Sequence, residues 1–258
     1  MSLIRRLASS PRLQIFLFAC VMAILTVSVP DDGRSETVEL ELVLAIDASA
    51  SVGRAEFDLQ ARGLAAAFRH PEVAAAISAL DGRAVMVSLV QWSSPDRQRV
   101  GVSWTRIMNA SDARTMAGKI ARMPRYVGSG GTAIGQAIAY AQAHLDGNGI
   151  DGRRKVIDVS GDGRANMGRM PSRSRDEVVD AGTTINGLAI LNEETGVDRY
   201  YSENVIGGAG AFIMTATDYS SFQEAIRRKL VREITGAGIV RGPDVAPSRS
   251  QLGAREPQ

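Results

Sequence analysis

The residues with the clearest chemistry stand at the end of one apolar run. The run 41–46 ends in Asp47, and Ser49 and Ser51 follow it at alternate positions. A carboxylate and two hydroxyls delivered in this way are oxygen ligands, which suit a hard divalent cation. The stretch therefore predicts part of a metal site.

Two later loops add oxygen ligands of the same kind. Thr132 closes a glycine-rich loop, and Asp162 follows the apolar run 155–159. In an open parallel sheet, ligands bind outside the carboxyl ends of the strands, and all of these residues fall where that crevice is expected. We predict a site for Mg²⁺, with Mn²⁺ or Ca²⁺ as alternatives. Its ligand set is Asp47, Ser49, Ser51, Thr132 and Asp162.

Each part of this set has a simpler explanation when taken alone. An Asp-x-Ser-x-Ser pattern arises by chance in about one chain in ten of this size on ordinary residue frequencies. Thr132 alone could cap a helix, and Asp162 with Gly163 could form an ordinary turn. Their order along the chain and their positions after strands favour the metal site.

Apolar runs and helical periodicities alternate along the chain and would position this site. Strands are expected at 38–46, 84–90, 98–104, 155–159, 183–190 and 211–215, and helices at 57–68, 71–80, 111–123, 134–145, 172–181 and 219–234. Most strands are apolar on both faces, which indicates a mainly parallel sheet covered by helices on both sides. The run 98–104 alternates instead, as a short antiparallel edge strand does. The predicted fold is a doubly wound α/β domain.

The composition predicts one domain with separate ends. The chain has 258 residues and is 45% hydrophobic, which is enough for one sizeable core. We assign this domain to 38–235, a linker to 31–37 and a disordered tail to 236–258. The formal charge of +2 comes without a basic block, which argues against a nucleic-acid partner.

The N-terminal segment, residues 1–30, predicts export. Arginines at positions 5, 6 and 12 precede an uncharged apolar stretch, 13–29, as in a signal peptide or a membrane anchor. We expect a periplasmic or secreted domain, with anchoring in the inner membrane by 13–29 as the alternative. Cys20 is the only cysteine, so no disulfide forms within the chain.

Three segments resemble the loops of the von Willebrand factor A domain: Val43–Val52, Gly128–Ile134 and Val156–Gly163. The resemblance covers most of 38–235 and implies that family's Rossmann-like fold and its metal-ion-dependent adhesion site (MIDAS). It further implies that the hydroxyls at positions 49, 51 and 132 bind the metal directly or nearly so, while the two carboxylates act partly through water. The chain also resembles an exported bacterial branch of this superfamily whose function is uncharacterised.

Neutral hydroxyls as direct ligands would leave the charge of a divalent cation only partly compensated. An Asp or Glu carboxylate from a protein partner would then complete the coordination shell. The expected function is cation-dependent protein binding, in adhesion or assembly, outside the cytoplasm. It is not catalysis.

Other functions have less support. A metal-dependent hydrolase or phosphoryl-transfer enzyme using Asp47 would carry a second acid where Ser49 stands. The chain has no Gly-x-Ser-x-Gly motif, and its two histidines, His70 and His144, lie away from the crevice. The glycine loop 128–133 fits a dinucleotide fingerprint, but no convincing strand precedes it. A structural module with a vestigial metal site stays open as an alternative.

Three further sets of polar residues need an explanation. Asp158 lies within an apolar strand, where a charge is costly unless it is paired. It would either support the metal loops or meet a buried arginine. Arg227–Lys229 are interpreted as the solvated face of the last helix. Tyr200, Tyr201 and Asn204 are placed in a connection that flanks the crevice, as a recognition patch.

Overall fold

The computed structural model of the protein describes residues 37–128 and 130–236. The predicted signal peptide or anchor, nearly all of the predicted linker and the tail beyond residue 236 lie outside this part. Within the described ranges, no helix has the length and apolar character needed to cross a membrane.

A six-stranded sheet forms the centre of the domain, in the order β4-β3-β2-β6-β7-β8. Its strands are β2 (Leu40–Asp47), β3 (Val85–Trp92), β4 (Gln98–Ile107), β6 (Lys155–Gly161), β7 (Thr184–Ile190) and β8 (Ile213–Ala216). All neighbours are parallel except β4, which pairs antiparallel with β3 at the edge. The predicted α/β fold and its antiparallel edge strand are therefore confirmed.

A small parallel pair lies outside this sheet. It joins β1 (Thr37–Val38) to β5 (Asp151–Gly152). Val38 is predicted as the start of the first long strand but pairs with Gly152 instead, and β5 is not predicted, because two residues are too few to show a period.

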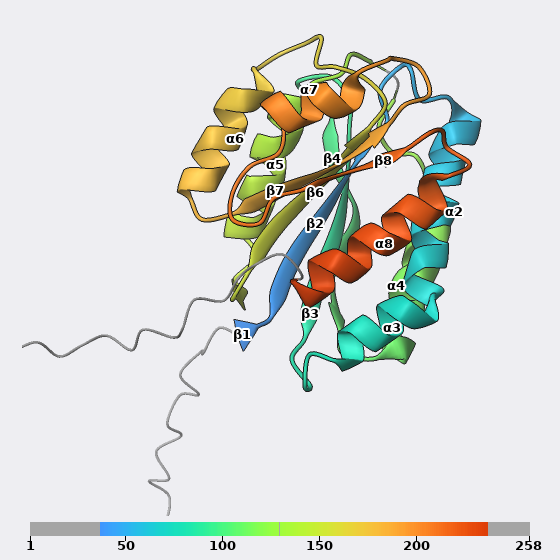
Figure 1. The fold of residues 1–258 in the computed structure, drawn as a ribbon, viewed down its shortest axis with the longest axis vertical. Coiled ribbons are helices and arrows are strands. Elements are labelled where there is room, and N and C mark those ends of the chain that lie inside the picture. The colour runs from blue at the N-terminus through green and yellow to red at the C-terminus, as the bar shows by residue number, and fades with distance from the viewer. Residues whose placement is uncertain (1–36, 129, 237–258) are drawn as a thin grey trace, which may run out of the picture. The chain divides into compact units, whose positions relative to one another are not determined.

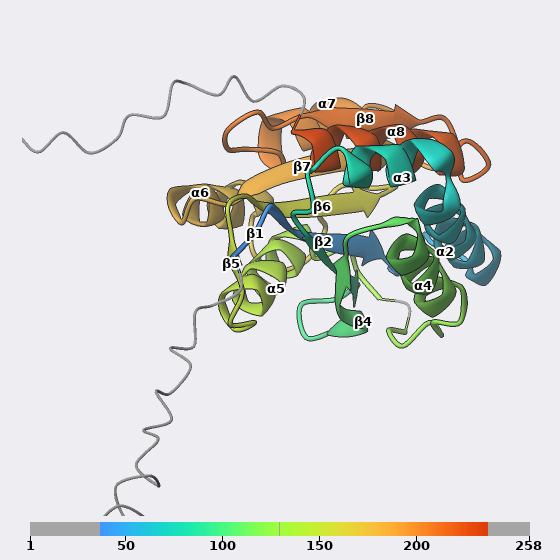
Figure 2. The ribbon, with the colours of Figure 1, turned by 90° about the horizontal axis from the view of Figure 1, so that it is seen from below.

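Helices cover both faces of the sheet, as Figures 1 and 2 show. One face carries α2 (Arg54–Arg69), α3 (Pro71–Ser78), α4 (Ala110–Ala121) and α8 (Phe222–Thr235), and the other carries α5 (Ile134–Asp146), α6 (Pro171–Asp180) and α7 (Val197–Asn204). Because β2 lies in the middle of the sheet, all of its residues are buried. This is why its sequence reads as one apolar run rather than an alternation.

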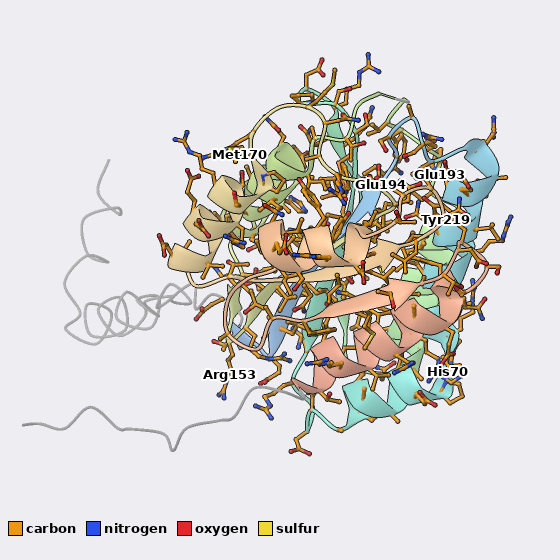
Figure 3. All side chains as sticks on the ribbon, turned by 45° about the horizontal axis from the view of Figure 1, so that its top comes forward. His70, Arg153, Met170, Glu193, Glu194 and Tyr219 are labelled. Atoms are coloured by element: carbon orange, nitrogen blue, oxygen red, sulfur yellow. The ribbon has the colours of Figure 1, made fainter. Side chains whose placement is uncertain are left out.

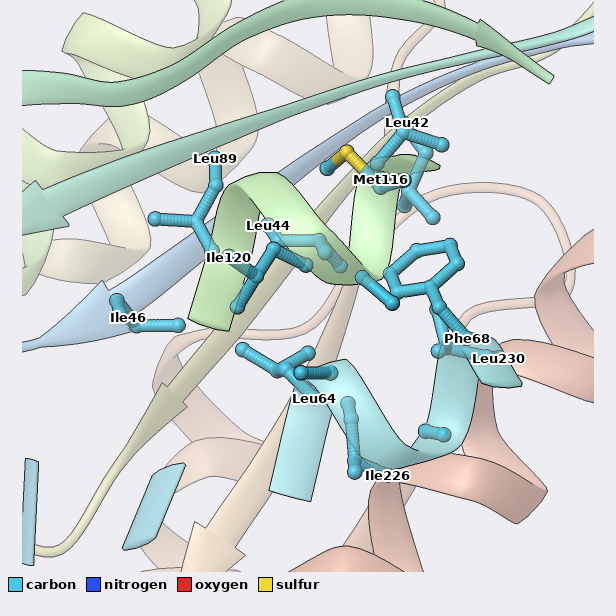
Figure 4. Packing of buried hydrophobic residues seen from close by; sticks show 14 of the residues in the cluster. Leu42, Leu44, Ile46, Leu64, Phe68, Leu89, Met116, Ile120, Ile226 and Leu230 are labelled. Carbon is cyan, nitrogen blue, oxygen red and sulfur yellow. The ribbon is translucent and has the colours of Figure 1, made fainter. Parts of the chain in front are cut away.

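The larger core cluster lies between the sheet and the first set of helices. Alternate residues of β2, including Leu42 and Leu44, point into it and meet side chains from α2, α4 and α8 (Figure 4). Burying one such side chain contributes roughly 1.5–3 kcal/mol, so this layer holds β2 firmly against the helices. The second cluster, under α5 and α7, includes Val43 and Ala45 from the opposite side of β2.

Helix α7 corrects the prediction that Tyr200, Tyr201 and Asn204 lie in a connection. These residues belong to an eight-residue helix, and Tyr201 is fully buried in the second cluster. Tyr201 is therefore no surface recognition residue. The helix begins after Gly196, whose φ of 78° is the left-handed conformation that glycine adopts readily.

The predicted solvated face of the last helix is wrong at Lys229. This side chain is fully buried, and its Nζ lies 2.8 Å from Asp158 Oδ1 and 2.6 Å from Glu233 Oε1. Asp158 therefore meets a buried lysine, and neither role predicted for it is correct. Arg228 is exposed, as predicted.

Candidate metal centre

Two carboxylates lie together at the carboxyl edge of the sheet. Asp47 is the last residue of β2, and Asp162 directly follows β6. The two strands are adjacent and parallel, with Ile46 opposite Ser160, so their ends meet. Both carboxylates are fully buried. Figure 3 turns this end of the domain toward the viewer.

A continuous series of polar contacts connects four of the five predicted ligands. Asp47 Oδ1 accepts a hydrogen bond of 2.7 Å from the Ser49 backbone N–H. The Ser49 and Ser51 hydroxyls lie 3.2 Å apart, and Ser51 Oγ donates to Asp162 Oδ1 at 2.8 Å. Spacing by two residues thus places both hydroxyls between the two carboxylates.

Thr132 joins the site through the backbone of its loop. The segment 48–52, which contains Ser49 and Ser51, is called the serine loop. The Ala50 N–H donates to Gly130 O at 2.8 Å, which fixes the glycine loop against the serine loop. The Thr132 N–H donates to Asn166 Oδ1 at 2.8 Å, and the Asn166 N–H returns a bond of 3.1 Å to Thr132 O. Thr132 is therefore held between the serine loop and the loop after β6.

Arg125 holds the backbone of the serine loop in place. Its guanidinium donates to the carbonyl oxygens of Ala48 at 2.7 Å, Val52 at 2.9 Å and Ser49 at 3.2 Å. The same group lies 5.5 Å from the centre of the Phe57 ring. The sequence gives little sign of this role, because Arg125 stands in an irregular segment far from the loop that it holds.

Two tyrosines also face the site: Tyr201, which the sequence predicts only as part of a surface patch flanking the crevice, and Tyr219, which is not predicted there. Tyr219 donates from its hydroxyl to Asp162 Oδ2 at 2.9 Å. A Cβ built on Gly161 would lie 2.6 Å from the Tyr201 hydroxyl and 2.8 Å from Asp47 Oδ2, so both oxygens face the space beside Gly161. Within the described residues, both are buried without a hydrogen-bond partner.

The buried carboxylates repel one another. Burial first, and the charge of Asp162 second, raise the pKa of Asp47 to about 7, although the Ser49 N–H and Arg125 oppose this. Burial and the same two carboxylates raise the pKa of Tyr201 and of Tyr219 above the usual range. A cation would offset the cost of holding both carboxylates ionised in one buried site.

The residues present fit a hard divalent cation. The donors are carboxylate and hydroxyl oxygens, and Asp47 Oδ2 is buried with its acceptor capacity unused in the described structure. No group of three or more His, Cys, Asp or Glu side chains with metal-binding geometry occurs in the described part of the chain. When bound, the cation would supply positive charge and coordination positions for a further oxygen ligand.

Comparison with known families identifies the chain. A family model described as "Protein of unknown function (DUF1194)" matches residues 37–238. The chain belongs to the DUF1194 family. No curated protein matches it.

Solved structures with a fold similar to this DUF1194 chain include von Willebrand factor A domains. Proximal thread matrix protein 1 from the mussel byssus is 14% identical, with a TM-score of 0.58 over 78% of this chain and 49% of its own. The DUF1194 chain thus spans about half of the mussel protein. A second structure of that protein, with a zinc-occupied MIDAS motif, has a TM-score of 0.54, 14% identity and the same coverages.

A bacterial domain gives the same result over nearly its whole length. The von Willebrand factor domain of the type V pili tip protein Mfa5 from Porphyromonas gingivalis is 13% identical, with a TM-score of 0.54. The match covers 80% of the DUF1194 chain and 98% of that domain. At these identities the likeness shows the fold, and the site must be argued from this chain's own residues.

Proposed function

We propose that this DUF1194 chain is a divalent-cation-dependent protein-binding module that serves adhesion or assembly outside the cytoplasm. The observation that carries the proposal is the row of two hydroxyls between two buried carboxylates. Ser51 is exposed at the outer end of this row, whereas Asp47 and Asp162 are not. A cation held there, Mg²⁺ or Mn²⁺, would be reached by a partner from the side of Ser51.

The burial of Asp47 favours binding over catalysis. A nucleophilic carboxylate must reach its substrate, but Asp47 has no exposed surface and its backbone carbonyl is fixed by Gln60 at 3.1 Å. Ser49 occupies the position of a second acid and is also fully buried. These features support a site that holds a cation for an incoming ligand rather than one that carries out phosphoryl transfer.

The partner's contribution follows from charge. Hydroxyl ligands leave the cation's charge only partly compensated, and an Asp or Glu carboxylate from a protein partner would complete its shell. The comparison structures support adhesion or assembly as the setting, since they include a byssus matrix protein and a pilus tip protein. They also support a location outside the cytoplasm, in agreement with the charge pattern of residues 1–30.

Metal titration of the full-length chain tests the proposal. Mg²⁺ should bind with a measurable heat, and saturation at about 100 times Kd should stabilise the fold by about 2.7 kcal/mol. Ser51→Ala and Asp47→Asn should abolish this stabilisation. Ser103→Ala, an exposed serine on β4, is the matched control and should keep it.

Two results would count against the proposal. If neither Mg²⁺ nor Mn²⁺ changes the unfolding midpoint, and Asp47→Asn is as stable as the original chain, the site is vestigial and the domain is structural. If Mg²⁺ binds but supports turnover of generic phosphoesters that Asp47→Asn abolishes, the chain is an enzyme.

A further inference from the structure

A polar pocket is lined in part by Arg164, which stands two residues after the candidate ligand Asp162. Its volume is about 440 Å³, and it lies between the loop after β6 and α7. Arg164 follows Asp162 by two residues, so the backbone of the pocket begins within about 7 Å of the Asp162 backbone. The residues that line the pocket are Arg164, Gly196, Arg199, Tyr200 and Glu203.

Two guanidinium groups give the pocket hydrogen-bond donors for an acidic ligand. Its lining carries two guanidinium groups and one carboxylate. Each arginine makes an ion pair near the surface: Arg164 Nε lies 2.7 Å from Glu194 Oε1, and Arg199 Nε lies 2.8 Å from Glu203 Oε1. Exposed pairs of this kind stabilise a fold only weakly, so a partner's carboxylate can replace or share them at little cost.

Arg164 is held in position before any ligand arrives. Glu194 accepts a bond of 3.1 Å from the Arg164 backbone N–H as well as pairing with its side chain. The guanidinium lies 5.6 Å from the centre of the Tyr200 ring. A planar group that is supported by a ring and by a carboxylate loses less rotamer freedom on binding, and a guanidinium can bind a carboxylate through two parallel hydrogen bonds.

We propose that this Arg164 pocket binds a second acidic side chain from the same partner segment whose first carboxylate completes the metal shell. The inference rests on the proposed function, because the partner's first carboxylate binds at the metal centre. An extended chain advances about 3.3–3.6 Å per residue. A span of about 7–14 Å between the two contacts corresponds to acidic residues about two to four positions apart.

A peptide selection tests the spacing directly. The probe is a display library of linear peptides with a fixed central Asp and randomised flanking positions, applied to the full-length chain in Mg²⁺ and in chelator. We expect binders that are lost in chelator and enriched in Asp or Glu at one spacing from the fixed residue. The partner class is then an extended protein segment with paired acids.

Calorimetry with an enriched peptide assigns the contact to the pocket. Arg164→Gln should weaken the peptide by about 10-fold, as expected for losing a charge-assisted hydrogen bond. Changing the second acid of the peptide to its amide should weaken binding by the same factor. The two changes together should weaken binding no more than either change alone. Mg²⁺ affinity, measured without peptide, should stay unchanged in Arg164→Gln.

Arg173→Gln is the matched control. Like Arg164, Arg173 is an exposed arginine paired with a glutamate, Glu177, but it lies on α6 outside the pocket. This variant should bind the peptide as the original chain does.

The outcomes separate the two proposals. Metal-dependent peptides without a preferred second acid, or an Arg164→Gln variant that binds them normally, would overturn the Arg164 pocket and leave the metal-dependent module standing. A library without any metal-dependent binder would overturn both. Acidic peptides that bind equally well in chelator would show a separate anion site and would also overturn the inference.

Discussion

Gly161 ends β6 beside the two unpartnered oxygens of the site. An added Cβ would overlap both the Tyr201 hydroxyl, at 2.6 Å, and Asp47 Oδ2, at 2.8 Å. Both neighbours are buried in closely packed surroundings, so neither can move away freely. At this position the absence of a side chain is a requirement of the site.

We expect Gly161→Ala to lose the stabilisation by Mg²⁺ and to lower the free energy of unfolding by about 1–3 kcal/mol, the usual cost of overpacking. Chemical denaturation with and without Mg²⁺ measures both effects. The control is Gly118→Ala within α4, where alanine should stabilise the helix by about 0.5–1 kcal/mol. Full Mg²⁺ stabilisation in Gly161→Ala would show that Asp47 Oδ2 does not take part in metal binding.

Arg125 is the second residue on which the site depends. It donates to three carbonyl oxygens of the serine loop without being a ligand itself. A lysine keeps the charge but cannot make these divergent contacts from one planar group. We expect Arg125→Lys to weaken Mg²⁺ binding by about 10-fold, as changes to residues that orient metal ligands commonly do.

Titration calorimetry with Mg²⁺ measures the effect of Arg125→Lys. Arg122→Lys, an exposed change on the same segment, should leave the affinity unchanged. Equal Mg²⁺ affinity in the Arg125→Lys variant and the original chain would show that the backbone alone fixes the serine loop.

At the scale of elements, a buried ionic cluster attaches α8 to the sheet. Lys229 lies between Asp158 of β6 and Glu233 one turn further along α8, and Asn186 of β7 donates to Glu233 at 2.9 Å. One lysine cannot balance two ionised carboxylates. Burial first, and the charge of Glu233 second, raise the pKa of Asp158 to about 7.

This shift predicts a stability that depends on pH. Because the folded-state pKa of Asp158 lies above its unfolded value, its contribution is complete below about pH 4 and is lost as the pH rises through about 7. Asp158→Asn imitates the protonated form at every pH. We expect the difference in unfolding free energy, variant minus original chain, to rise by about 2 kcal/mol between about pH 5 and about pH 8.

Denaturant unfolding of the original chain and of Asp158→Asn at each pH measures this difference. Asp47 titrates in both proteins, so its contribution cancels when one unfolding free energy is subtracted from the other. A difference that stays constant with pH would mean that Asp158 is already ionised in the folded protein at low pH.

Elements with a strong period were predictable, and those fixed by distant contacts were not. The continuous apolar runs of β2, β3, β6 and β7 identify a parallel sheet from sequence alone. Helix α7 was missed because it spans two turns and buries only Val197 and Tyr201, too few residues to show a period. Lys229 was misplaced because its neighbours Arg227 and Arg228 give the segment the composition of a solvated face.

The residues of the candidate site also divide into those that local patterns predict and those that distant contacts bring there. The ligand positions follow from strand ends and local spacing, so Asp47 and Asp162 could be placed together without a structure. Arg125, Tyr201 and Tyr219 reach the site from segments far away in the sequence, and no local pattern indicates which side chain a fold brings under a loop. Of the predicted ligands, Thr132 is the one whose link to the others is through backbone bonds.

At the scale of the whole domain, the two ends of the sheet carry different sets of polar contacts. The candidate metal centre lies at the carboxyl end of β6. At the amino end, Arg154 donates to the carbonyl oxygens of Glu233 and Ile234 at 2.7 and 2.8 Å, and its Nε lies 3.7 Å from Glu39 Oε1. The first and last described segments therefore meet there, away from the site.

Distance should keep these two ends energetically separate. Arg154 and Asp162 stand on either side of the seven residues of β6, so about 26 Å lie between them, which is more than three times the screening length of about 8 Å at physiological salt. We expect Arg154→Gln to lower the free energy of unfolding by about 1–3 kcal/mol, because buried carbonyls lose their donors. The Mg²⁺ affinity should not change.

Denaturant unfolding and Mg²⁺ calorimetry on one preparation separate the two quantities. Arg153→Gln is the matched control, since Arg153 is exposed and contributes a backbone bond to Val38 that the substitution keeps. It should change stability by no more than about 0.5 kcal/mol. If Arg154→Gln instead weakens Mg²⁺ binding as strongly as it weakens the fold, then the end of α8 and the metal centre form one coupled unit, and displacement of α8 would regulate the site.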